Sequence, residues 1–464
     1  MVQSLEQIQD DLLNHRISVT DLVSQYLQQI KKYEGLNIYV EVFEDEALQR
    51  AEALDQKIKQ SPDTLGDLFG CVASIKDVLC YKDHKVTAAS NMLNGFTSQF
   101  TATALQSALD ADMIIIGRTN CDEFAMGSSN ENSTYGPTHN GLDPKRIPGG
   151  SSGAAAVSVQ MNTCLVAFGS DTGGSVRQPA AFCGVYGMKP TYGRISRYGL
   201  IAYASSFDQI GLLSKDLNSI SKTLKVIEGF DPMDSTSLYV EDIIPESTSH
   251  NFVYFSEALH HPSIAEEIRT SFQHKLEELR RKGHQVQEIS FDLIDYLVPC
   301  YYVLTTAEAS SNLNRFDGIR YGLQDSSNKN LRELYIENRS NGFGLEVKRR
   351  IMMGTFVLSV GYYDAYFNKA QKVRKLIVDK VTDILKNHDF ILMPTTPEVA
   401  WPIGDKLDDP VSIYLTDIFT VLANICGLPA ISAPQLNQDS LPHGLQIMGS
   451  KMSDATLLSA AQLL

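Results

Sequence analysis

The chain has 464 residues, of which 43% are hydrophobic and 20% are charged, and its formal net charge is −15. A chain of this length can bury a large site, and its composition excludes a disordered or low-complexity protein. The acidic balance supplies no overall positive field for a phosphate backbone, so we do not expect this chain to grip nucleic acid by itself.

The seven cysteines are scattered and form no CxxC pair, a pattern typical of a reducing compartment. No apolar run approaches the roughly 18 residues of a membrane span. Residues 1–11 are acidic and amphipathic, unlike a basic and apolar signal peptide. We therefore expect a cytoplasmic protein without a membrane-bound part, and we predict no metal site.

Three segments near the N-terminus show apolar residues at helical spacing. Ser4 can cap the first helix and Thr20 can cap the second. The apolar faces of the three helices consist of Leu5, Ile8 and Leu12; Leu22, Tyr26 and Ile30; and Ala47, Ala51, Leu54 and Ile58. We expect residues 1–67 to form a helical segment that serves as scaffold.

From about residue 68, short apolar runs alternate with helical patterns. The runs that predict buried strands are residues 71–75, 113–117, 165–168, 252–255, 286–291, 390–393 and 430–433. Such alternation indicates an α/β fold whose sheet is buried on both faces. No repeat or linker divides the sequence, so we predict one large domain over residues 1–464.

Two clusters rich in glycine and serine indicate a site that binds an anion. Residues 148–153 read PGGSSG and residues 169–175 read GSDTGGS. Glycines let backbone N–H groups converge on an anion, either a phosphate or the oxyanion of acyl transfer. Ser175 stands where a phosphate loop GxxxxGK[ST] has its lysine, which favours the oxyanion. The structural alternative for either cluster is a turn that tightens strand-to-helix packing.

Residues 149–153 also fit GxSxG, the nucleophile elbow of α/β-hydrolases, with Ser151 at its centre. That interpretation needs an acid and a histidine further along the chain, and His388 and His443 are candidates. With ten histidines in the sequence, such a match carries little weight.

Lys76 is the better candidate for a base. It ends the apolar run of residues 71–75, and burial of an ammonium is costly unless the lysine finds a partner or becomes neutral. A neutral lysine can accept a proton near pH 7, and serine–lysine pairs are a known form of nucleophilic catalysis.

Residues 69–213 resemble the amidase signature family, through the lysine after a short strand (residues 74–77), the two glycine-serine clusters, and Arg177 and Pro179. The resemblance implies an α/β amidase signature fold, a large mixed sheet covered by helices on both faces. Residues 68–215 would be the catalytic signature core, and residues 216–464 the remainder of the domain with the substrate pocket.

The resemblance also implies a role for each residue of the clusters. Ser175 would be the nucleophile, Ser151 the bridge that follows a cis peptide bond, and Lys76 the ultimate base. Asp171 and Arg177 would orient the loop. The oxyanion hole would consist of the backbone N–H groups of Thr172, Gly173, Gly174 and Ser175.

Three further segments, residues 117–131, 308–317 and 348–366, are similar to one branch of that family, the A subunits of glutamyl-tRNA(Gln)/aspartyl-tRNA(Asn) amidotransferases. The likeness implies a glutaminase whose ammonia travels to a partner protein. Arg350 would bind the α-carboxylate of glutamine and Asp417 its α-ammonium, which suits the fork geometry of a guanidinium. The remaining pocket residues would be Tyr302 or its neighbour Tyr301, with Met126 and Ser128 beside the reacting amide.

The same likeness implies a heterotrimer with the B and C subunits of such enzymes, in which misacylated tRNA is bound through the B subunit. ATP and Mg²⁺ would be used at that partner, and this chain would bind no cofactor. The sequence leaves open whether Glu-tRNA(Gln), Asp-tRNA(Asn) or both are served. Two alternatives remain, a stand-alone amidase of the same family and a non-catalytic scaffold, although Lys76, Ser151 and Ser175 speak against the scaffold.

Overall fold

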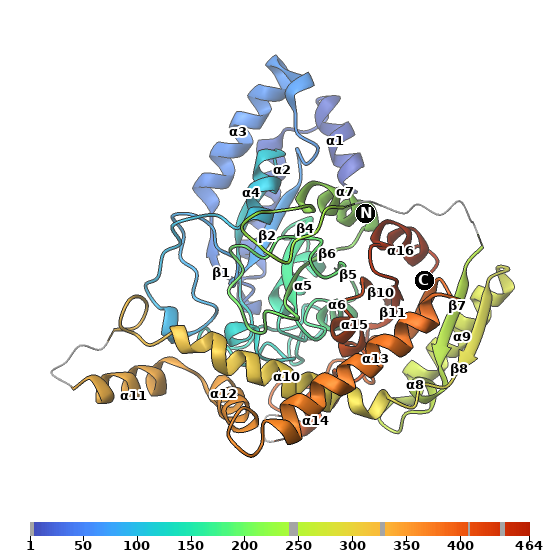
Figure 1. Ribbon diagram of the computed structural model, residues 1–464. Coiled ribbons are helices and arrows are strands. Elements are labelled where there is room, and N and C mark those ends of the chain that lie inside the picture. The colour runs from blue at the N-terminus through green and yellow to red at the C-terminus, as the bar shows by residue number, and fades with distance from the viewer. Residues whose placement is uncertain (1–3, 241–248, 325–329, 407–408, 437–440) are drawn as a thin grey trace.

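The computed structural model describes residues 4–240, 249–324, 330–406, 409–436 and 441–464. The strands in these ranges form a single mixed sheet of 11 strands in the order β1-β3-β2-β4-β6-β5-β10-β11-β9-β7-β8. Helices flank this sheet (Figure 1), so the predicted fold class is confirmed. The predicted division of the chain at residues 67 and 215 stays a prediction.

The strands differ in length and burial. Their bounds are β1 (Tyr39–Val42), β2 (Val72–Lys76), β3 (Ile114–Thr119), β4 (Val166–Asp171), β5 (Tyr186–Lys189), β6 (Gln209–Ser214), β7 (Asn251–Phe255), β8 (Gln285–Ile289), β9 (Phe390–Pro394), β10 (Ala430–Gln435) and β11 (His443–Gly449).

The α-helices are mostly short to medium in length. Their bounds are α1 (Leu5–Leu13), α2 (Val19–Lys32), α3 (Glu44–Gln60), α4 (Thr103–Asp110), α5 (Gly153–Gln160), α6 (Arg177–Cys183), α7 (Leu217–Ile227), α8 (Ser256–His260), α9 (Glu266–Arg281), α10 (Leu297–Asn312), α11 (Leu331–Gly342), α12 (Leu345–Val357), α13 (Lys369–Leu385), α14 (Pro410–Leu415), α15 (Val421–Cys426) and α16 (Asp454–Ala461). None of those helices is both long and apolar enough to cross a membrane.

The seven predicted strands are all present, as β2, β3, β4, β7, β8, β9 and β10. β2 pairs in parallel with β3 and β4, and every residue of these three strands is buried, which explains their continuous apolar sequences. Strands β1, β5, β6 and β11 were not predicted. β1 is half-exposed. In β5, β6 and β11, glycine and polar residues interrupt the apolar residues, so the sequence shows no continuous apolar run.

The three N-terminal helices stand together at one end of the molecule (Figure 1), and Ser4 caps α1 as predicted. The prediction that Thr20 caps α2 is wrong. Ser18 is the N-cap and accepts a hydrogen bond from the backbone N–H of Asp21. The Thr20 hydroxyl instead donates to Asp55 Oδ2 of α3 at 2.6 Å, because Thr20 is already the second residue of the helix, two positions past the N-cap.

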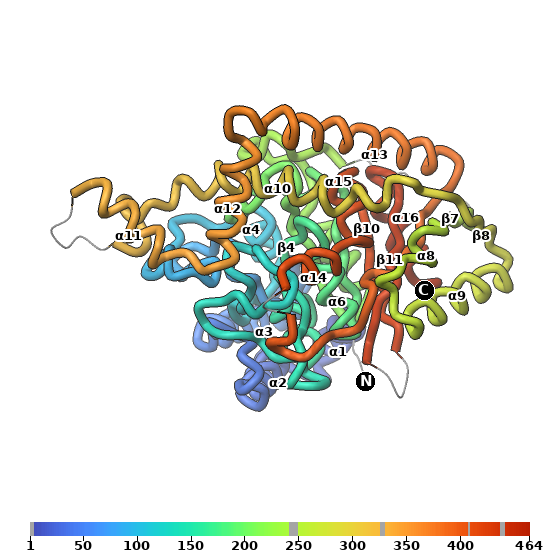
Figure 2. The backbone as a smooth tube through the Cα atoms, turned by 90° about the horizontal axis from the view of Figure 1, so that it is seen from below, coloured from blue at the N-terminus to red at the C-terminus, as the bar shows by residue number. Residues whose placement is uncertain are grey.

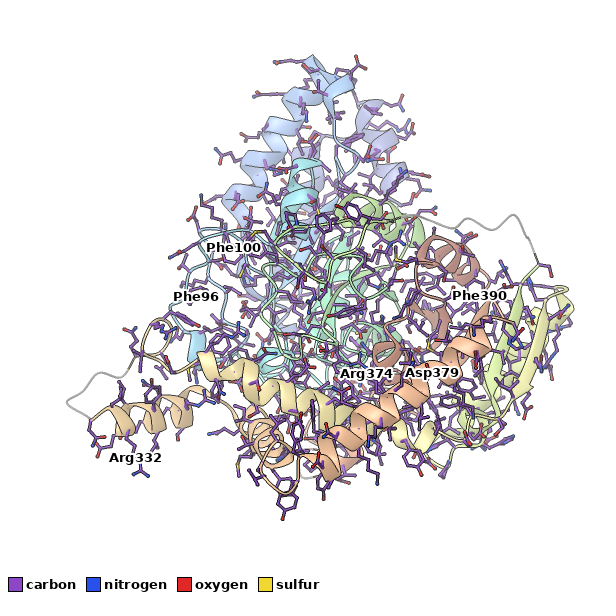
Figure 3. The ribbon with its side chains drawn as sticks, viewed as in Figure 1. Phe96, Phe100, Arg332, Arg374, Asp379 and Phe390 are labelled. Atoms are coloured by element: carbon purple, nitrogen blue, oxygen red, sulfur yellow. The ribbon has the colours of Figure 1, made fainter. Side chains whose placement is uncertain are left out.

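Several helices pack directly on the sheet and fix the loops that enter them. α5 packs on β2 and β4, and α6 packs on β5, β10 and β11. α10, α12, α13 and α15 pack on one another, with α13 running along the outside of this group (Figure 2). Phe390 of β9 lies on the opposite side of the molecule from Phe96 and Phe100 (Figure 3).

Candidate active site

Two neighbouring parallel strands end at the candidate site. β2 ends with Lys76 and β4 ends with Asp171, and the two strands are in register with Ile75 opposite Phe168. The carboxyl ends of parallel strands meet at one edge of a sheet, which is where α/β proteins bind their ligands. Lys76 is thereby placed beside the second glycine-serine cluster.

Lys76 contacts three serine hydroxyls. Its Nζ lies 2.7 Å from Ser151 Oγ, 3.0 Å from Ser152 Oγ and 2.9 Å from Ser170 Oγ. The side chain is fully buried, and this burial lowers the pKa of Lys76 to about 8. About one tenth of the lysine is therefore neutral at pH 7, far more than for an exposed lysine, and the neutral form is the one that accepts a proton.

Ser151 is buried at the start of the turn into α5, and the Gly150–Ser151 peptide bond is cis. The N–H of Gly150 donates to Gln178 Oε1 at 2.9 Å. The Asp122 carboxylate lies against Gly150 so closely that a Cβ there would overlap it. These contacts fix the backbone that aims Ser151 at Lys76.

Ser175 lies between β4 and α6 and is partly exposed, whereas Ser151 is buried. The Ser175 carbonyl accepts a hydrogen bond from the N–H of Ser152 at 3.1 Å, which joins the two glycine-serine clusters. Within the described ranges the Ser175 hydroxyl makes no hydrogen bond. It is the hydroxyl of the cluster that an incoming substrate can reach.

The oxyanion loop, residues 171–175, is held by Asp171. Its carboxylate accepts from the N–H of Gly174 at 2.9 Å and from Arg177 Nη2 at 3.0 Å. Burial raises the pKa of Asp171, but the Arg177 guanidinium outweighs it and holds the pKa at about 2. Both residues therefore orient the loop, as the sequence predicted.

This geometry corrects the predicted set of oxyanion donors. The N–H of Gly174 is already donated to Asp171, so Gly174 does not point a free donor into the site. The backbone N–H groups of Thr172, Gly173 and Ser175 form no hydrogen bond with the residues that the structure describes. These three remain as candidate donors to an oxyanion.

Asp417 lies three residues before Thr420, whose hydroxyl donates to the Gly173 carbonyl of this loop at 2.6 Å. Tyr302 Oη donates to Asp417 Oδ2 at 2.9 Å, and Ser128 Oγ lies 3.2 Å from both carboxylate oxygens. Burial raises the pKa of Asp417 to about 7. An incoming ammonium would stabilise the ionised carboxylate, so the pocket favours a cationic group at this point.

Arg350 lies over the ring of Tyr302. Its guanidinium carbon lies 5.4 Å from the centre of the Tyr302 ring, and its Nε and Nη1 donate to Glu346 and to Tyr203 Oη at 2.8 and 2.9 Å. Nη2 makes no hydrogen bond with the described residues. Arg350 is 3% exposed, so this remaining donor is suited to a desolvated carboxylate.

The adjacent residues Tyr301 and Tyr302 contact different parts of the site. Tyr302 binds Asp417, whereas the Tyr301 ring lies so close to Gly173 that a Cβ there would overlap it. Met126 is fully buried in the same apolar cluster as both rings. The structure thus brings the predicted pocket residues together, and both tyrosines line the site.

A family model described as Amidase matches residues 21–458 of the chain, and the catalytic clusters lie within that span. The chain belongs to the amidase signature family. Curated relatives named as the A subunit of glutamyl-tRNA(Gln) amidotransferase include one from Chlorobium phaeobacteroides (strain BS1), 47% identical with 99% of this chain and 98% of the relative covered. Another, from Koribacter versatilis, is 44% identical with 96% and 94% covered.

Solved structures agree with this family. The amidase resembles the crystal structure of the glutamyl-tRNA(Gln) amidotransferase A subunit from Thermotoga maritima with a TM-score of 0.79 and 37% identity, covering 97% of this chain and 94% of that chain. It shares its fold with a bacterial aryl acylamidase of the amidase signature enzymes at a TM-score of 0.83 and 21% identity, covering 100% and 96%.

The α/β-hydrolase interpretation finds no support in this amidase. The imidazole of His388 contacts Ile384 and Gln287. His443 Nε2 is buried without a hydrogen-bond partner in the described structure. The buried partner of Ser151 is Lys76, so the site is built on serine and lysine.

Sequence reasoning missed several residues of the amidase site. Ser152 and Ser170 stand within the glycine-serine clusters, and their positions could have suggested that they contact Lys76. The others give no such signal, because segments distant in the chain bring them to the site. They are Asp122, Gln178, Tyr203, Asp208, Glu346 and Tyr414.

Proposed function

We propose that this amidase is the glutamine-hydrolysing A subunit of a tRNA-dependent amidotransferase, and that its ammonia amidates a misacylated tRNA on a partner protein. The observation that carries the substrate is that Arg350 and Asp417 both contact Tyr302, Arg350 over its ring and Asp417 at its hydroxyl. A buried cation and a buried carboxylate so arranged are complementary to the α-carboxylate and α-ammonium of an amino acid. The names of the relatives support the same conclusion.

The reaction begins with Ser175 Oγ attacking the side-chain amide carbon. Its proton passes to Ser151, whose own proton passes to neutral Lys76 across the 2.7 Å contact. The N–H groups of Thr172, Gly173 and Ser175 would stabilise the negative charge that develops on the amide oxygen, where each donor is worth about 2.7–4 kcal/mol of barrier.

Collapse of this intermediate expels the nitrogen. The proton returns from Lys76 through Ser151 to the leaving nitrogen, ammonia departs, and a glutamyl ester remains on Ser175. Water then attacks the ester, Lys76 again receives the proton through Ser151, and glutamate leaves when the proton returns to Ser175.

The remaining parts of the proposal concern the assembly. We expect a heterotrimer with the B and C subunits in the cytoplasm, with misacylated tRNA bound through the B subunit and with ATP and Mg²⁺ used there. The net charge of −15 on this chain supports the view that a partner protein, rather than this chain, binds the tRNA.

The test is purification from the native source, followed by assays of glutamine hydrolysis with and without misacylated tRNA. We expect two other proteins to co-purify and misacylated tRNA to raise hydrolysis, with correctly charged tRNA as the control. A chain that purifies alone, ignores tRNA and cleaves small neutral amides as fast as glutamine would be a stand-alone amidase.

A further inference from the structure

A continuous chain of contacts joins Arg350 to the oxyanion loop. Arg350 Nη1 donates to Tyr203 Oη at 2.9 Å, and the backbone N–H of Tyr203 donates to Asp208 Oδ2 at 2.8 Å. Thr172 Oγ1 then donates to Asp208 Oδ1 at 2.7 Å. None of these four side chains is more than 3% exposed, so water does not compete for the bonds.

Both oxygens of the Asp208 carboxylate are in use. Oδ2 accepts from the N–H groups of Tyr203 and Ala204, and Oδ1 accepts from Thr172. Asp208 stands immediately before β6, which pairs with β4 so that Gln209 lies opposite Asp171. A buried carboxylate is costly unless it is hydrogen-bonded, and here its three bonds tie the turn at residues 203–208 to the oxyanion loop.

Neighbouring helices hold this turn in place. Tyr203 Oη donates to Thr305 Oγ1 of α10 at 3.1 Å. Arg374 of α13, labelled in Figure 3, has its guanidinium carbon 4.4 Å from the centre of the Phe207 ring. Because both ends of the turn are anchored, a displacement of the Tyr203 hydroxyl is passed to Asp208 rather than absorbed.

We propose that Asp208 is a positioning residue that couples capture of the substrate carboxylate at Arg350 to the geometry of the oxyanion loop. The identity of that carboxylate rests on the proposed function. A carboxylate bound by Arg350 fixes the guanidinium and hence Tyr203. Asp208 then holds Thr172 with its backbone N–H aimed at the reacting carbonyl, so the coupling acts on kcat as well as on binding.

The first test uses the full chain and Thr172→Val, which removes the hydroxyl bond to Asp208 and keeps the backbone N–H. We expect kcat to fall roughly ten- to hundredfold, because a displaced oxyanion donor is costly, with KM nearly unchanged and with Thr172→Ser restoring the rate. Thr103→Val is the matched control, since Thr103 Oγ1 donates to the carboxylate of Asp231 at 2.6 Å outside this chain of contacts. An unchanged kcat in Thr172→Val would overturn the proposal.

The second test compares glutamine with 4-aminobutanamide, which keeps the amide and the ammonium but lacks the carboxylate. If the coupling operates, we expect the native chain to show a higher kcat for glutamine than for 4-aminobutanamide. Tyr203→Phe removes the hydroxyl that receives Arg350, so we expect the ratio of the two kcat values to fall roughly tenfold. A rise in the KM for glutamine with an unchanged kcat ratio would show that Tyr203 serves binding alone and would contradict the coupling.

These outcomes separate the coupling from the proposed function. A native chain that cleaves 4-aminobutanamide and not glutamine contradicts the glutaminase proposal, and the effect of Thr172→Val on 4-aminobutanamide hydrolysis then still tests the role of Asp208. A native chain that hydrolyses glutamine normally while Thr172→Val and Tyr203→Phe leave kcat intact contradicts the coupling alone.

Discussion

Lys76 Nζ lies 2.7 Å from Ser151 Oγ, and both side chains are fully buried. Lys76 makes no hydrogen bond to Ser175 among the residues that the structure describes, and the proposed mechanism therefore routes the proton of Ser175 through Ser151. The burial that removes water from the lysine also lowers its pKa to about 8. The same packing therefore supplies both features that the proposed base needs, a lowered pKa and a contact with Ser151.

Replacement of the lysine by a neutral side chain of similar length removes the base. We expect Lys76→Met to lower kcat for glutamine about 10³-fold, within the range typical of a lost general base, while circular dichroism stays native. Lys215→Met is the control, because this partly buried lysine donates to Gln160 O at 2.7 Å away from the triad. Full activity in Lys76→Met would exclude the lysine as the base.

The pH profile of kcat follows the ionisation of Lys76. Burial lowers its pKa to about 8, and only the neutral amine accepts a proton, so activity falls as the pH drops below 8 and levels off above it. An exposed lysine would place this limb more than two pH units higher. Stopped assays between pH 6 and 10 measure the limb, and a midpoint near 10 would contradict a buried neutral lysine.

Arg350 separates glutamine from amides that have no carboxylate. We expect Arg350→Ala to lower kcat/KM for glutamine at least a hundredfold, since a buried charge-assisted contact is lost, and to affect 4-aminobutanamide much less. Arg349→Ala is the matched control, because the neighbouring guanidinium also pairs with Glu346 but is partly exposed. Equal losses on both substrates in Arg350→Ala would argue against a carboxylate clamp.

Gly173 provides a steric test of the oxyanion loop. A Cβ at this position would lie 2.5 Å from the Tyr301 ring, so Gly173→Ala has to displace either the loop or the Tyr301 ring, and both line the site. We expect kcat to fall about 10²–10³-fold, the cost of a lost oxyanion donor, with the fold retained. Gly35→Ala meets nothing within 4 Å and serves as the control, and native activity in Gly173→Ala would place the donors elsewhere.

Local sequence was enough to locate Lys76, Ser151 and Ser175. Each belongs to a short motif whose residue types indicate a catalytic role. These motifs are a lysine that ends a buried strand and serines that follow paired glycines. The strands with continuous apolar sequences were predicted for the same reason. β1, β5, β6 and β11 were missed because pairing with neighbouring strands, rather than their own sequence pattern, makes them strands.

The contacts of the pocket could not be read from local sequence. Ser128 meets Asp417 across 289 positions and Arg350 meets Tyr203 across 147, so their partners depend on how distant segments are folded together. The donor set of the oxyanion loop was predicted one member too large. The competing acceptor, Asp171, stands only three residues from Gly174, but its orientation is set by Arg177 and Asn424.

The sequence by itself supplied the candidate reacting groups and determined the class of fold, because motif chemistry and hydrophobic pattern are properties of neighbouring residues. The tertiary structure decided which backbone N–H groups stay free, how Tyr301 and Tyr302 divide their contacts, and how Asp208 ties the pocket to the loop. These features depend on burial and on competition for hydrogen bonds, and both arise when segments far apart in the chain exclude water from one another.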